Sequence, residues 1–133
     1  MELATVLVVE KDILVRQPLG QYLRDCGYRV LEAVNGTEAR ESLSSGEYTI
    51  DVALIGVKSV PSESGFALAS WVRLNHPTVN VLLGGTIAKV LQLAGDLCED
   101  GPDGPLDHRA VLDHIRRLLA ARKRGSSDAG SKQ

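Results

Sequence analysis

Aromatic residues are scarce in this chain of 133 residues: one Trp, one Phe and three Tyr make up 4% of it. The hydrophobic fraction is 44%, so a core has to be built from Val, Leu, Ile and Ala. That composition suits buried parallel strands that are covered by helices. The length fits one domain.

Long apolar runs and a surplus of charge are also absent. No run approaches the roughly 20 apolar residues of a membrane-spanning helix. The N-terminus passes from Glu2 into a strand-like run without the pattern of a secretory signal. With 15 basic and 17 acidic residues the net charge is -2, so nothing global indicates a nucleic-acid or membrane partner. We therefore expect a cytoplasmic protein.

Cysteine and histidine are few and scattered. Cys26 and Cys98 belong to no CxxC motif and no Cys/His cluster, so we expect them to be small apolar residues of the core. His108 and His114 are six positions apart and would lie on different faces of a helix. We predict no metal site and no cofactor.

Short continuous apolar runs alternate with segments of helical periodicity. Strands are expected at 5–9, 28–33, 52–55, 79–83 and, as the shortest, 97–98. Helices are expected at 12–26, 35–43, 87–94 and 107–122, and one more holds Phe66 to Val72 and is closed by Pro77. Such alternation predicts an α/β fold with a parallel sheet and helices on both faces.

Three helix ends have local signals. Asp12 is a candidate N-cap and Gly27 a stop for the first helix, and Asn35 with Glu38 resembles a capping box. Pro18 conflicts with the first helix, because an internal proline removes a hydrogen bond at a cost of about 3 kcal/mol. A bend, or a helix that begins later than Asp12, would resolve the conflict.

Ligand sites of parallel α/β sheets form at the carboxyl ends of the strands. The positions that follow the strands here are Glu10-Lys11, Gly56 and Gly84-Gly85-Thr86. A site, if the chain has one, is expected among them.

Several segments, in the right order, resemble response-regulator receiver domains over about residues 4–122. They are 6–12 (VLVVEKD) with Val15-Arg16, 26–30 (CGYRV) with Ala33 and Asn35-Gly36, 51–61 (DVALIGVKSVP) with Gly65-Phe66, and the closing helix of Leu112, Ile115, Leu118 and Leu119. The resemblance implies the flavodoxin-like receiver fold, with five parallel strands in the order 2-1-3-4-5. It also implies a receiver-like domain over residues 1–122, which leaves 123–133 as a short, basic and flexible tail.

Receivers accept a phosphoryl group from a histidine kinase on an aspartate that ends the third strand, and acidic residues after the first strand hold Mg²⁺. This chain departs from that pattern at each matching position. It has Glu10-Lys11 at the acidic pair, Gly56 at the phosphoacceptor, Gly85 at the Thr/Ser switch with Thr86 one residue later, and Pro102 or Gly104 at the lysine. An acyl phosphate cannot form on glycine, and Lys11 would repel Mg²⁺.

The resemblance and these departures predict a stand-alone pseudo-receiver of bacterial two-component or phosphorelay signalling, with no catalytic residue and no enzyme activity. Its partner would be a histidine kinase, a phosphotransfer protein or a regulator, and a homodimer is a further option. One hypothesis is that the Lys11 ammonium replaces the metal by pairing with Glu10. An alternative function is a small-anion or nucleotide sensor in the former phosphorylation pocket, with backbone N–H groups near Gly84-Gly85-Thr86 as donors.

Overall fold

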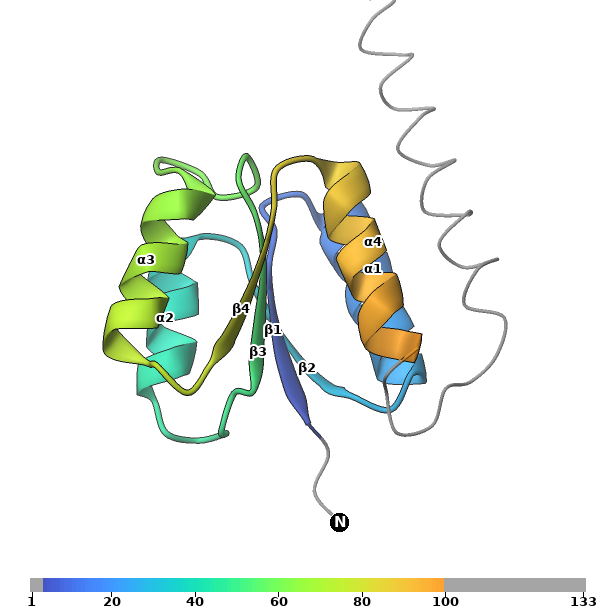
Figure 1. The fold of residues 1–133 in the computed structure, drawn as a ribbon, viewed down its shortest axis with the longest axis horizontal. Helices are drawn as coiled ribbons and strands as arrows, with labels where there is room; N and C mark the ends of the chain where they lie inside the picture. Colours follow the sequence, from blue (N-terminus) through green and yellow to red (C-terminus); the bar gives the residue numbers. More distant parts are fainter. Residues whose placement is uncertain (1–3, 100–133) are drawn as a thin grey trace, which may run out of the picture.

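The computed structural model describes residues 4–99, in which four strands alternate with four helices (Figure 1). The elements are β1 (Thr5–Val9), α1 (Ile13–Asp25), β2 (Arg29–Ala33), α2 (Gly36–Ser44), β3 (Val52–Gly56), α3 (Gly65–Asn75), β4 (Asn80–Gly84) and α4 (Ile87–Glu99).

The strands form one parallel sheet in the order β2-β1-β3-β4. In Figure 1 the helices α2 and α3 cover one face of this sheet, and α1 and α4 cover the other. The predicted fold class and the order of the first four strands are confirmed.

Each face of the sheet has its own apolar cluster. Alternate β1 residues divide between them: Val6 and Val8 face α1 and α4, and Leu7 and Val9 face α2 and α3. Successive side chains of a strand point to opposite faces, so a strand that is covered on both faces is apolar throughout. This explains the continuous run that marks β1 in the sequence.

The local signals at the helix ends are confirmed. Asp12 is the N-cap of α1, and its carboxylate accepts a hydrogen bond from the Leu14 N–H at 2.9 Å. Gly27 has a φ of 100°, the left-handed conformation that ends many helices. Asn35 Oδ1 accepts from the Glu38 N–H at 2.8 Å, and Glu38 Oε1 accepts from the Val34 N–H at 3.0 Å.

Pro18 lies inside α1, which begins directly after Asp12. The later start that was expected as one resolution is therefore wrong. The helix tolerates the proline because a full face of it is buried, made up of Val15, Leu19, Tyr22 and Leu23. Tertiary packing of this kind contributes more to helix stability than intrinsic propensity does.

The helix expected at 87–94 is present, but its expected end and the strand expected at 97–98 are wrong. Leu97 and Cys98, expected as a fifth strand, belong to α4, which continues past Ala94 to Glu99. The buried α4 residues Val90, Leu91, Ala94 and Cys98 recur at helical spacing, and their packing outweighs the cost of about 1 kcal/mol for Gly95 inside the helix. A fifth strand is not among residues 4–99, and the expected helix 107–122 and tail 123–133 lie outside the described residues.

Candidate functional site

The carboxyl ends of β1, β3 and β4 meet at one edge of the sheet, where they border a cleft of about 780 Å³. It is lined by Glu10, Lys11, Asp12, Val15, Gly56, Val57, Lys58, Ser59, Gly84, Gly85, Thr86, Ile87 and Ala88. The structure thus brings together the predicted positions Glu10, Lys11, Gly56, Gly85 and Thr86. Pro102 and Gly104 lie outside the described residues.

Glu10 is 4% exposed, and local hydrogen bonds hold it in place. Its Oε2 accepts from the Asp12 N–H at 2.9 Å, and its backbone N–H donates to the Ala33 carbonyl at 3.0 Å. Its own carbonyl accepts from Nη1 of Arg16 at 3.0 Å. The Glu10 carboxylate therefore organises the turn between β1 and α1.

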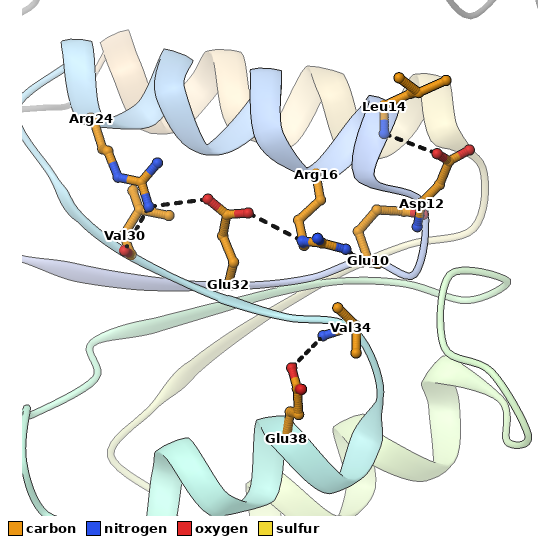
Figure 2. A network of polar contacts seen from close by, with 9 residues as sticks. All are labelled: Glu10, Asp12, Leu14, Arg16, Arg24, Val30, Glu32, Val34 and Glu38. Carbon is orange, nitrogen blue, oxygen red and sulfur yellow. Dashed lines mark hydrogen bonds and ion pairs between the residues drawn. The ribbon is translucent and has the colours of Figure 1, made fainter.

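Two arginines on α1, Arg16 and Arg24, bind the Glu32 carboxylate of β2 (Figure 2). Arg16 Nε donates to Glu32 Oε1 at 3.1 Å, and Arg24 Nη2 donates to Glu32 Oε2 at the same distance. Arg24 also donates to the Val30 carbonyl at 3.1 Å. Because Arg16 contacts both Glu32 and Glu10, this network links β2 to the turn at the cleft. Sequence reasoning missed it; the usable signal was two arginines eight positions apart on one helix face, opposite a charged residue in β2.

Lys11 is exposed, and only its backbone contacts the opposite loop, through a 3.0 Å hydrogen bond from its N–H to the Ser59 carbonyl. Within residues 4–99 it forms no ion pair with Glu10. The pairing that the lysine-for-metal hypothesis needs is therefore not present in this structure.

Gly56 ends β3, and the space above it is taken by two neighbours. A Cβ at this position would overlap the Ser59 hydroxyl and would lie 3.4 Å from Val90 Cγ2. Ser59 is only 3% exposed, and its side chain is the nearest neighbour of that Cβ. Sequence reasoning had noted Ser59 only as a nucleophile without a general base, and could not foresee that its side chain lies over Gly56.

The end of β4 also lies close to α4. A Cβ on Gly84 would lie 2.7 Å from Val90 Cγ2 and 2.9 Å from the Val90 backbone nitrogen, whereas one on Gly85 would meet nothing within 4 Å. Thr86 directly precedes α4: its Oγ1 accepts from the Lys89 N–H at 3.1 Å and its carbonyl from the Val90 N–H at 3.0 Å. The Thr86 hydroxyl thus serves as a helix cap.

These residues do not fit a divalent cation of the kind that receivers bind. Mg²⁺ takes oxygen ligands in a near-octahedral set. Here the Glu10 carboxylate accepts a backbone hydrogen bond, Lys11 brings a positive charge, and Gly56 has no side chain. No group of three metal-ligating side chains occurs within residues 4–99.

In the same part of the chain, no helix is both long and apolar enough to span a bilayer.

No family model matches the chain. It is 39% identical over 79 residues to a cyclic di-GMP phosphodiesterase of Thermotoga maritima, covering 59% of this chain and 20% of that protein. It is 32% identical over 123 residues to the transcriptional regulatory protein GltR of Pseudomonas aeruginosa, covering 86% of this chain and 48% of that protein. The chain spans about half, or less, of the length of the curated relatives that it matches.

The solved structures that this chain resembles include response regulators. The response regulator TrrA of Thermotoga maritima, in complex with Mg(2+)-BeF, is similar with a TM-score of 0.55 and 28% identity, over 61% of this chain and 68% of that one. TrrA has also been solved in complex with the histidine kinase ThkA. The chemotaxis response regulator CheY4 of Vibrio cholerae gives a TM-score of 0.56 and 25% identity, over 88% of this chain and 99% of that one.

Proposed function

We propose, from the premise that this chain belongs to the family of response-regulator receiver domains, that it is a signalling module that binds a protein partner without accepting a phosphoryl group. Gly56 carries the proposal, because it stands at the end of β3 without a nucleophilic side chain. Ser59 and Val90 lie beside it, so a longer side chain at this position would require the Ser59 hydroxyl to move.

Phosphorylation can be tested directly. The full chain is incubated with acetyl phosphate and Mg²⁺, or with a phosphorylated histidine kinase, next to a receiver that has the complete acidic pocket. We expect the control to be labelled and this chain not to be. Because Lys11 occupies a metal-ligand position, the variant Gly56→Asp should also fail to acquire Mg²⁺-dependent label. Mg²⁺-dependent label on the natural chain, mapped to any residue by mass spectrometry, would overturn the proposal.

The proposed partner is a protein of a two-component pathway: a histidine kinase, a phosphotransfer protein or a regulator. TrrA, a relative in structure, forms a complex with a histidine kinase. In this chain Ile13 and Leu14 begin α1 beside the cleft and are 57% and 59% exposed. The two side chains are adjacent in sequence and both apolar, and contiguous exposed apolar surface marks sites of protein interaction.

The interface can be tested by pull-down of such a partner with the full chain. We expect Ile13→Ser with Leu14→Ser to abolish capture and to leave the fold intact. Leu74→Ser is the matched control, since Leu74 lies on α3 and is 80% exposed. Equal loss with both variants would mean that the α1 surface is not the docking site.

A small-anion or nucleotide sensor remains the second candidate, favoured by the Ser59 hydroxyl and by two lysines. Lys11 and Lys58 both line the cleft, are exposed, and form no ion pair among the described residues. Glu10 and Asp12 also line it, so the charges of the lining cancel. This cancellation is why the sensor ranks second.

Ligand binding raises the melting temperature by linkage. Inorganic phosphate, sulfate and a nucleoside triphosphate should raise it for the natural chain if the sensor exists, and Lys11→Ala with Lys58→Ala should remove the effect. Lys89→Ala is the control, because Lys89 lies on α4 outside the cleft lining. No shift with any of these anions eliminates the second candidate.

A further inference from the structure

The helix α4 is fastened against α1 at its C-terminal end by a covalent bond. Cys98, in its last turn, forms a disulfide with Cys26, the C-cap of α1. The sequence expectation that the cysteines are buried is correct, since they are 1% and 0% exposed, but they are not separate core residues. A second contact lies next to the disulfide: the Tyr28 hydroxyl donates to the Leu97 carbonyl at 2.6 Å.

The other end of α4 forms one wall of the cleft. Its first turn contributes Ile87 and Ala88 to the lining, and Val90 packs against the positions of Gly56 and Gly84. One helix therefore joins the disulfide to the site. We expect a change in how firmly its C-terminal end is held to alter both the surface that α1 and α4 share and the wall of the cleft.

We propose that the Cys26–Cys98 disulfide is a reversible redox latch that holds α4 on α1, and that a dithiol reductant releases it. The inference depends on the geometry of α4, not on the proposed partner binding. It goes beyond the proposed partner binding, because it proposes that the redox state of this disulfide controls the α1–α4 surface and the cleft. The reductant belongs to the class of dithiol proteins or small dithiols.

The chemistry balances as a thiol–disulfide exchange. A thiolate of the dithiol attacks one sulfur of the pair, the S–S bond breaks, and the other cysteine leaves as a thiolate that takes up a proton. The second thiol of the reductant then attacks the mixed disulfide and releases the first cysteine. The protein gains two electrons and two protons, and the dithiol becomes a disulfide.

The position of the bond favours reversibility. Both sulfurs are buried, but Cys26 and Cys98 lie at the ends of their helices, where opening costs the least free energy. Attack on the disulfide requires a local opening at these helix ends that exposes one of the two buried sulfurs.

The first test is reduction of the folded full chain in native buffer. After equilibration with an oxidised dithiol, alkylation should find no free thiol, and after reduced dithiothreitol it should find two. The melting temperature should fall by on the order of 10 °C on reduction and recover on reoxidation. Cys26→Ala with Cys98→Ala is the control, and its melting temperature should not respond to either reagent. Thiols that stay free under oxidation, or a bond that resists reduction without denaturant, would overturn the latch.

The second test is hydrogen exchange of α4 in the two redox states. Reduction should speed amide exchange in residues 87–98 about tenfold or more, which corresponds to about 1.4 kcal/mol in the opening equilibrium, and should leave α2 and α3 unchanged. Tyr28→Phe should make reduction several-fold faster, because it removes the other bond at the end of α4. Tyr48→Phe, at an exposed tyrosine, is the matched control. Equal exchange of α4 in both states, or a reduction rate that Tyr28→Phe does not change, would contradict the proposal.

Discussion

At the residue scale, neighbouring glycines of the cleft have different reasons to lack a side chain. Gly84 is in close contact with Val90, including its backbone nitrogen, whereas the space around Gly85 is open. At Gly56 the space for a side chain is intermediate between these two cases. The atom nearest to an added Cβ there is the Ser59 hydroxyl oxygen, which can rotate away. The absence of a side chain at Gly84 therefore lets α4 approach the sheet, and Gly56 offers no side chain that could act as a nucleophile.

Gly84→Ala should destabilise the chain by about 1–3 kcal/mol, because the added methyl group would push against the Val90 backbone and force α4 to shift. Gly85→Ala is the matched control. It should change stability by less than about 1 kcal/mol, and a small gain is expected from the reduced entropy of the unfolded chain. Urea unfolding of both variants measures the difference. Equal stabilities would show that α4 does not contact β4 this closely.

A residue pair away from the cleft makes stability depend on pH. Arg40 Nη1 and Nη2 donate to the two Glu63 oxygens, both at 2.9 Å. The hydrogen bond from Arg40 lowers the pKa of Glu63 and raises that of Arg40, although burial of each group acts in the opposite direction. The pair joins α2 to the loop that leads into α3.

Because the folded pKa of Glu63 is depressed, its contribution is fully present above its unfolded pKa of about 4.3 and is lost as pH falls through the lower folded value. The pair is partly exposed, so the contribution should be about 1 kcal/mol or less. Melting temperatures between about pH 6 and pH 3 measure it. Glu63→Gln should flatten part of the acid slope, and Arg40→Gln should flatten the same part, since either change removes the pair. Slopes that match the natural chain would refute this assignment.

At the element scale, α1 organises both the cleft and the covalent contact. Its N-terminal turn carries Asp12 and the Glu10 hydrogen bonds, its exposed side pairs Arg16 and Arg24 with Glu32, and its end carries Cys26. Pro18 lies between these parts and cannot donate the backbone bond to the Leu14 carbonyl that an α-helix would place there.

Pro18→Ala should therefore stabilise the chain, by about 1–3 kcal/mol. The restored hydrogen bond and removed ring clash favour the folded state, and the loss of proline rigidity in the unfolded chain offsets part of the gain. Gln17→Ala, at an exposed neighbouring position of α1, should change stability by less than about 0.5 kcal/mol. Chemical unfolding measures both. A destabilised Pro18→Ala variant would show that the surrounding structure is fitted to the proline.

At the scale of the whole molecule, the sheet separates two apolar clusters, and α4 completes the one on the α1 side. That cluster draws on β1, α1, β2, β3 and α4, so it joins segments from nearly the whole described range. The face toward α2 and α3 is built from more local segments, between β1 and β4. Removal of α4 would therefore uncover the part of this face that α1 does not cover.

Leu91→Ala tests this role of α4. Leu91 is 1% exposed within the α1-side cluster, so truncation should cost about 2–5 kcal/mol through lost burial and a cavity. Leu74→Ala, at an 80% exposed leucine of α3, should fall within about 0.5 kcal/mol of the natural chain. Thermal or urea unfolding distinguishes them, and a mild effect of Leu91→Ala would mean that α4 is not part of the core.

Sequence alone determined the features that depend on local rules. Buried strands β1 and β3 appeared as continuous apolar runs, Asp12, Gly27 and Asn35 marked helix ends, and the βα alternation implied a parallel sheet with its site at one edge. The absence of a nucleophilic side chain at Gly56 was equally predictable, because it is a property of the residue itself. These features follow from periodicity and from short-range hydrogen bonds.

Only the tertiary structure decided what depends on contacts between distant residues. The end of α4 looked like a strand because Gly95 breaks its pattern, and only packing against α1 makes Leu97 and Cys98 helical. The disulfide brings together cysteines that are 72 positions apart, and spacing alone cannot indicate such a pair. The Ser59 hydroxyl over Gly56 likewise depends on how a loop folds back. The sequence showed that Gly56 offers no side chain to the cleft, and the fold showed that the Ser59 side chain lies beside it.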